Sequence, residues 1–182
     1  MQDSTISIFG SAQAQPGSPA YDEAKRAGRL LAQAGFIVCS GGYGGVMEAA
    51  SLGAKEMGGS TIGVTTDHFV RFAANPWVDR EIRTATFMER LQKLIDVGDG
   101  YLALKGGIGT LTEISVVWSL QQTRSIDPRP FVLLADPWEA LLDFCSEQLI
   151  IRTTDFRHLQ LSSSPEDAVA ALVEGMAQGG AR

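Results

Sequence analysis

Residues 101–113 read YLALKGGIGTLTE, and they give the strongest indication of the fold. An apolar run of strand length, Tyr101–Leu104, ends in a turn with three glycines, and a helical pattern follows over Thr110–Gln122. Glycine lets the backbone approach a ligand closely, and the free N–H groups at a helix start favour an anion. The stretch therefore predicts a strand, a turn and a helix that hold a phosphate on Gly106, Gly107, Gly109 and Thr110.

A second glycine-rich turn has the same arrangement. Residues 40–48 read SGGYGGVME, follow the apolar run Phe36–Cys39, and lead into a helical pattern over Val46–Met57. Four glycines in the five positions 41–45 are more than a tight turn requires. Neither turn has the G-x-G-x-x-G or GK[ST] pattern of the common nucleotide-binding loops. We expect this turn to supply further ligand-binding residues, namely Gly41, Gly42, Gly45 and Met47.

Strand-length apolar runs alternate with helical patterns along the whole chain. Strands are expected at 5–9, 36–39, 60–64, 101–104 and 131–134, and helices at 20–34, 46–57, 86–97, 110–122, 137–150 and 165–176, with short extended segments within 76–84 and around 158–161. This alternation predicts an α/β fold of the Rossmann-like type, a doubly wound parallel sheet with helices on both faces. We expect a single domain over residues 1–182, with 178–182 frayed.

Composition limits the classes of function. The chain has 182 residues and a net charge of −6, and its basic residues are scattered, which argues against a nucleic-acid surface. No apolar run reaches the roughly 20 residues of a membrane span, and the first residues lack a signal-peptide pattern, so we expect a cytoplasmic protein. Cys39 ends an apolar run and is expected to be buried, while His68 and His158 stand alone. No metal site and no cofactor are expected.

Two acidic side chains near the turns each allow two interpretations. Glu113 stands three residues after Thr110, so the pair could form a capping box, in which each side chain hydrogen-bonds the other residue's backbone N–H. Alternatively, Glu113 contacts a sugar or stabilises positive charge that develops on it. Glu48 could be a helix-start acid favoured by the helix dipole, or a secondary candidate for a ribose contact.

Arg90 also allows two interpretations. It stands in the helical segment Thr86–Val97 between Glu89 and Leu91, a setting typical of a solvated surface helix. Alternatively, a fixed guanidinium can hold the oxygens of a phosphate or a sugar. The residues alone favour the surface interpretation.

The motifs resemble those of the LONELY GUY (LOG) family, once often labelled lysine decarboxylases. Residues 105–113 are similar to its PGGxGTxxE motif, residues 40–47 to its GGGxxGLM motif, residues 86–93 to its M-x-x-R-K helix, and Gly10-Ser11 to the turn after its first strand. The resemblance implies a homodimer that hydrolyses the N-glycosidic bond of a nucleoside 5′-monophosphate, such as AMP. It implies that Arg90 and Glu113 are catalytic, and that the phosphate lies on Gly107, Gly109 and Thr110.

Several positions depart from the LOG motifs. Lys105 replaces the motif proline, Leu91 the lysine after the arginine, Ser40 the first glycine, and Glu48 another glycine. The segment GGVMEAA is more similar to a sister branch that includes molybdenum cofactor carriers. The alternative function is therefore a carrier that binds a nucleotide or the molybdenum cofactor without turnover. The long irregular segment around 65–80, including Trp77, is expected to contribute to a base pocket.

Overall fold

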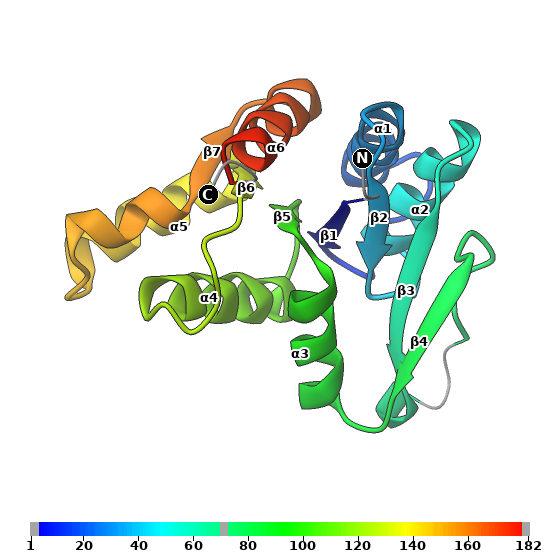
Figure 1. Ribbon diagram of the computed structural model, residues 1–182, viewed down its shortest axis with the longest axis horizontal. Coiled ribbons are helices and arrows are strands. Elements are labelled where there is room, and N and C mark those ends of the chain that lie inside the picture. Colours follow the sequence, from blue (N-terminus) through cyan, green and yellow to red (C-terminus); the bar gives the residue numbers. More distant parts are fainter. Residues whose placement is uncertain (1–3, 70–72, 180–182) are drawn as a thin grey trace.

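The protein forms a seven-stranded parallel sheet with helices on both faces (Figure 1). The structure is a computed structural model and describes residues 4–69 and 73–179. The strands are β1 (Thr5–Phe9), β2 (Ile37–Ser40), β3 (Thr61–Thr66), β4 (Arg80–Thr84), β5 (Gly100–Ala103), β6 (Phe131–Leu134) and β7 (Gln160–Ser162). The helices are α1 (Pro19–Gln33), α2 (Val46–Glu56), α3 (Phe87–Val97), α4 (Ile108–Gln122), α5 (Ala135–Gln148) and α6 (Pro165–Gly179), with short 3₁₀ turns at Asp67–Phe69 and Thr153–His158.

The strand order is β4-β3-β2-β1-β5-β6-β7, so the sheet is doubly wound as expected. The chain builds outward from β1 through β2 and β3 to the edge strand β4, then returns to the other side of β1 with β5. The point between β1 and β5 is where the winding direction changes. In open α/β sheets, ligands bind at the carboxyl ends of the strands beside such a point.

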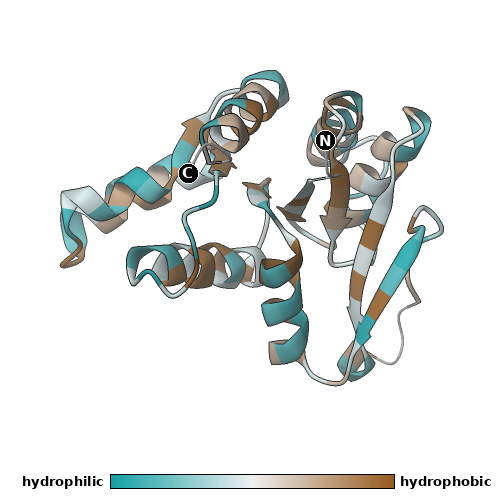
Figure 2. Ribbon diagram, viewed as in Figure 1, coloured by the Kyte–Doolittle hydropathy of each residue, from teal (hydrophilic) through white to brown (hydrophobic). Residues whose placement is uncertain are grey.

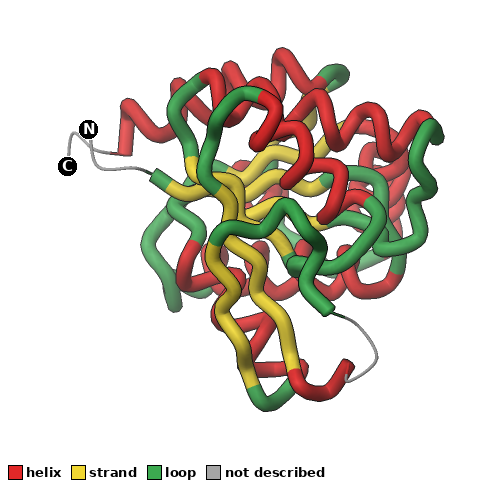
Figure 3. Tube along the Cα trace, turned by 90° about the vertical axis from the view of Figure 1, so that its right-hand side faces the viewer, coloured by secondary structure: helices red, strands yellow, loops and turns green. Residues whose placement is uncertain are grey.

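Two hydrophobic layers enclose the sheet. One joins it to α1, α2 and α6, and the other joins it to α3, α4 and α5. Figure 3 shows the strands running through the middle of the molecule between these helices. The central strands are buried along their whole length, which explains their continuous apolar runs.

The edge strand β4 differs from the others. Its sequence REIRT is largely exposed and polar, as its colouring in Figure 2 shows, while the neighbouring strand β3 is fully buried. Exposed charges on an edge strand oppose pairing with other chains. The same charges explain why the sequence indicates only a short extended segment here.

Element boundaries shift by a few residues from those expected. Helix α6 continues to Gly179 rather than ending at Met176, so residues 178 and 179 are helical, while 180–182 lie outside the described residues. Helix α4 begins at Ile108 rather than Thr110. Within the described part of the chain, no helix has the length and apolar character that crossing a membrane would need.

Candidate functional site

A cleft of about 490 Å³ lies at the carboxyl ends of β1, β2 and β5, beside the point where the winding changes. It is lined from five segments of the chain: Gly10, Ser11, Ala12 and Gln13 after β1; Tyr43, Gly44 and Met47 in the turn before and the start of α2; Phe69 after β3; Phe87 and Arg90 on α3; and Gly107, Ile108, Gly109, Thr110 and Glu113 at the start of α4. The two glycine-rich turns thus meet where the fold predicts a ligand.

The turn after β1 ties the two glycine-rich turns together. The backbone N–H of Ser11 donates to the carbonyl oxygen of Lys105 over 3.1 Å, and the N–H of Val46 donates to the carbonyl oxygen of Ser11 over 2.8 Å. A Cβ on Gly10 would come within 2.2 Å of the Val46 side chain. Glycine is required here because the turn packs directly against the start of α2.

The start of α4 faces the cleft with open space in front of it. Gly107 is the N-cap residue, and no side chain caps the helix. A Cβ on Gly107 or on Gly109 would meet nothing within 4 Å, so packing inside the chain does not demand glycine at either position. The open space in front of these glycines leaves room for a ligand to approach the backbone, and free N–H groups at a helix start suit an anion.

Of the two interpretations of Glu113, the capping box with Thr110 is wrong. Because α4 begins at Ile108, Thr110 stands inside the first turn and does not cap it. Thr110 is buried, and a Cβ on Gly106 would come within 2.1 Å of its hydroxyl oxygen. Glu113 is therefore left to face the cleft.

Arg90 is buried, so the interpretation as a solvated helix residue is wrong. Only 6% of its surface is exposed. Its Nε donates to the carbonyl oxygen of Val64 over 2.8 Å, one terminal nitrogen donates to the carbonyl oxygen of Gly41 over 3.1 Å, and the guanidinium lies 5.5 Å from the ring centre of Tyr43. These contacts fix the positive charge at the edge of the cleft.

The start of helix α3, which determines where Arg90 lies, is fixed by a capping box that was not predicted from the sequence. The Thr86 hydroxyl accepts from the N–H of Glu89, and the Glu89 carboxylate accepts from the N–H of Thr86, which forms the capping box. Leu91, Leu94 and Ile95 are buried on the side of α3 that packs against the sheet. The pattern T-x-x-E at 86–89 is the sequence signal for this helix start.

The Glu113 carboxylate is only partly exposed and lines the cleft. Burial raises its pKa to about 7, and the positive charge of Arg90 opposes part of this rise. Among the described residues, no hydrogen bond or ion pair to the Glu113 carboxylate is formed. A carboxyl group with a pKa near neutrality in a cleft is well suited to proton transfer.

Aromatic side chains form one wall of the cleft. The rings of Tyr43 and Phe69 lie 5.8 Å apart, and those of Phe69 and Phe87 lie 6.4 Å apart. The Tyr43 hydroxyl donates to the carbonyl oxygen of Thr66 and accepts from its N–H, which fixes the ring. The sequence indicates the segment around 65–80 but not the correct residue, because Phe69 and not Trp77 lines the cleft.

The predicted site residues fall into two groups: those that line the cleft and those that do not. Gly10, Ser11, Met47, Gly107, Gly109 and Thr110 line it together with Arg90 and Glu113. Gly41, Gly42, Gly45 and Gly106 are not among its lining residues. The Gly41 carbonyl oxygen accepts from Arg90, and a Cβ on Gly45 would come within 2.3 Å of the Ser11 carbonyl oxygen. These glycines shape the two turns. Glu48 does not line the cleft.

Comparison with known proteins points to the same group of proteins as the motifs. The chain is 30% identical over 180 residues to a cytokinin riboside 5′-monophosphate phosphoribohydrolase of Mycobacterium marinum, covering 94% of each chain. It is 33% identical over 142 residues to a protein of the same name from Mycobacterium tuberculosis, covering 75% of this chain and 72% of the relative.

Solved structures extend the comparison to a second kind of protein. The molybdenum cofactor binding protein of Rippkaea orientalis superposes with a TM-score of 0.76 at 27% identity, over 96% of this chain and 98% of the other. The model of the SLOG cluster4 family matches residues 3–138, which hold both glycine-rich turns, Arg90 and Glu113. The chain therefore belongs to the SLOG cluster4 family, a LOG-related group of Rossmann-like proteins.

Proposed function

We propose that the protein hydrolyses the N-glycosidic bond of nucleoside 5′-monophosphates to a free base and ribose 5-phosphate. The observation that carries the proposal is the position of Glu113, a partly buried carboxylate in the same cleft as an open helix start and an aromatic wall. These three features match the three parts of a nucleotide. The open helix start suits the phosphate, the carboxylate suits the ribose, and the aromatic wall suits the base.

The phosphate is proposed to bind at the start of α4. The N–H groups of Gly107, Ile108 and Gly109 and the Thr110 hydroxyl would donate to its oxygens, while Gly10 and Ser11 close the other side. Gly41, Gly42, Gly45, Met47 and Gly106 would hold the turns in shape. Binding at the phosphate, away from the bond that breaks, orients the sugar over Glu113.

The bond between C1′ of the ribose and the base nitrogen breaks with its electron pair leaving on the base. Positive charge then develops on the ribose, as it does in glycoside hydrolysis. In its ionised form, Glu113 stabilises this charge and takes a proton from the water that attacks C1′. The departing base gains a proton, so one water is consumed for each base released. Arg90 is proposed to fix the oxygens of the sugar phosphate.

A carrier function is the second candidate, and one specific observation favours it. The solved structure from Rippkaea orientalis is named as a molybdenum cofactor binding protein and matches almost the whole chain. Lys105 and Leu91 also depart from the motifs of the hydrolases. A carrier would use the same open helix start for a phosphate group of its cargo. It would show binding without turnover.

Turnover distinguishes the two candidates. The purified protein would be incubated with a panel of nucleoside 5′-monophosphates and the matching nucleosides, and free base and ribose 5-phosphate followed by chromatography. The hydrolase proposal expects base and ribose 5-phosphate in equal amounts from at least one nucleotide, and much slower release from its nucleoside. Tight nucleotide binding without any release would overturn it and favour the carrier.

A further inference from the structure

A second cavity, of about 620 Å³, lies at the opposite edge of the sheet from the cleft. Its walls include Pro130 and Phe131 at the start of β6, Gln160 at the start of β7, and Gly175 on α6. Because the strands are parallel, their starts and their carboxyl ends lie on opposite edges. The cavity is therefore separate from the proposed nucleotide site.

Gln121, at the end of α4, lines this cavity and has a buried side-chain N–H group without a partner among the described residues. The residue is only 2% exposed, and its Oε1 accepts from the backbone N–H of Arg129 over 3.1 Å. That bond fixes which end of the amide is the oxygen. The Nε2 group is left without a partner among the described residues. Buried amide groups are rarely left unpaired, so a partner that is not among the described residues is expected.

The cavity also holds two arginines, Arg129 and Arg157, that form no ion pair with a described carboxylate, together with one acidic residue, Asp127. Arg129 is held by the carbonyl oxygens of Ile95 and Gly98 and by the Tyr101 hydroxyl, all neutral acceptors. Arg157 lines the same cavity, and within the described chain neither arginine has an ion-pair partner. The remaining charged or titratable groups of the lining are His158 and Asp127.

We propose that this cavity binds the phosphate or carboxylate group of a small metabolite. The Gln121 amide would donate to the anion from the floor of the cavity, and the guanidinium groups of Arg129 and Arg157 would supply charge and further donors. Guanidinium groups pair well with both kinds of oxyanion. The volume leaves room for a ligand larger than the anion alone.

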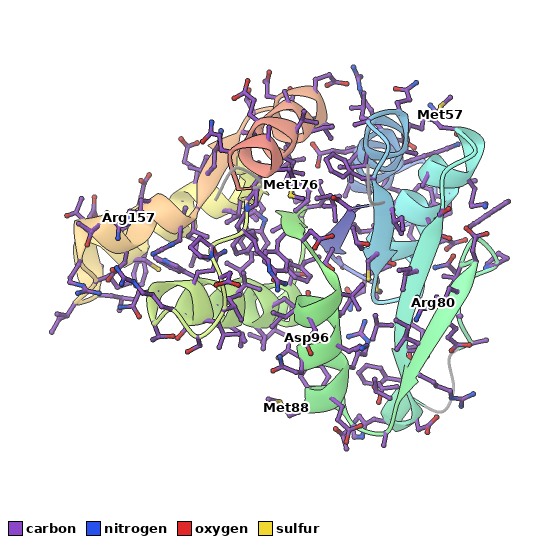
Figure 4. All side chains as sticks on the ribbon, in the orientation of Figure 1. Met57, Arg80, Met88, Asp96, Arg157 and Met176 are labelled. Carbon is purple, nitrogen blue, oxygen red and sulfur yellow. The ribbon has the colours of Figure 1, made fainter. Side chains whose placement is uncertain are left out.

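Substitutions can distinguish anion binding in this cavity from a general effect of the protein's net charge. Arg157→Gln removes one charge from the cavity, and Gln121→Glu keeps the acceptor for Arg129 while replacing the amide donor with a repelling carboxylate. The matched control is Arg80→Gln, because Arg80 is an exposed arginine at the start of β4, and Figure 4 shows it on the far side of the molecule from Arg157.

The test is a titration of the full chain with inorganic phosphate and, separately, with succinate at matched ionic strength. The side-chain N–H resonances of Gln121 and Arg129 report the cavity, so binding at the start of α4 is read separately. We expect saturable shifts with at least one anion. The affinity for that anion should fall about tenfold or more in Arg157→Gln and in Gln121→Glu, but not in Arg80→Gln. In Gln121→Glu, which lacks the amide, binding is followed at Arg129. The absence of saturable shifts with both anions, or equal affinity in all variants, would overturn the proposal.

Discussion

Arg90 joins three parts of the molecule that are distant in sequence. It reaches from α3 to the backbone of Val64 in β3, 26 positions away, and of Gly41, 49 positions away. Burial lowers the pKa of the guanidinium, and the nearby Glu113 charge opposes that effect. The side chain thus fixes both the shape of the turn after β2 and the charge of the cleft.

Replacing Arg90 should therefore reduce stability as well as activity. Arg90→Met fills similar space but leaves two buried carbonyl oxygens without donors, so we expect a loss of roughly 2–4 kcal/mol in the free energy of unfolding. Chemical denaturation measures this loss. Arg83→Met is the control, because Arg83 forms an exposed ion pair with Asp67, and such pairs contribute little to stability. Equal losses in both variants would contradict the structural role of Arg90.

Glu113 makes stability depend on pH in a particular direction. Its pKa rises from 4.5 to about 7 on folding, so the folded protein keeps a proton that the unfolded chain releases between these values. Stability should then fall as pH rises through this window. Glu113→Gln cannot ionise, so at about pH 8 it should be more stable than the natural protein by up to roughly 3 kcal/mol.

Denaturation curves at several pH values test this expectation. Below the unfolded pKa, the natural protein and Glu113→Gln should have nearly equal stability, since Glu113 is then protonated in both states. Glu147→Gln, which alters an exposed carboxylate, should not reproduce the effect. A Glu113→Gln variant that is no more stable than the natural protein at about pH 8 would contradict the raised pKa of Glu113.

At the scale of elements, the alternating pattern predicts the sheet and its helices because central strands and helix faces are apolar in sequence. It does not predict that Arg90 is buried, since the hydrogen-bond partners of Arg90 depend on how β2, β3 and α3 come together.

The predicted start of α4 is wrong by two residues because Gly107, rather than a residue nearer Thr110, occupies the N-cap position. The ligand edge of the sheet could be predicted; the aromatic wall could not, because Phe69 follows β3 in a segment without a periodic pattern.

The open start of α4 gives a direct test of ligand approach. In Gly109→Ala the new Cβ meets no atom of the chain within 4 Å, and alanine favours helix more than glycine. We expect equal or higher stability, together with AMP affinity lowered about tenfold or more, measured by calorimetry. Ser115→Ala, on an exposed part of the same helix, is the control. Unchanged AMP affinity in Gly109→Ala would mean that the phosphate binds elsewhere.

At the scale of the whole molecule, apolar side chains are exposed around α4 and the end of α5. Apolar residues of α4 do not gather on one side, as they would on a helix with one solvated face. Phe144, Leu149 and Ile150 are exposed, and a groove of about 320 Å³ runs between Ile150 and Trp118. These features support the proposal, first implied by the LOG resemblance, that two copies of the chain associate.

Sedimentation equilibrium tests this association. We expect the natural protein to sediment as a dimer and Ile150→Asp to shift toward the monomer, because a buried unpaired charge opposes association. Val173→Asp, at an exposed apolar residue on α6, should leave the dimer intact. A monomeric natural protein would rule out the proposed homodimer.

In the proposed reaction, Glu113 acts on the ribose of a nucleotide held by the start of α4. The most direct measurement compares the natural protein with Glu113→Gln, recording both AMP affinity by calorimetry and release of adenine and ribose 5-phosphate by chromatography. We expect similar AMP affinity in both proteins, and release that is slower by about two orders of magnitude or more in Glu113→Gln. Release at an undiminished rate by Glu113→Gln would contradict the proposed role of Glu113.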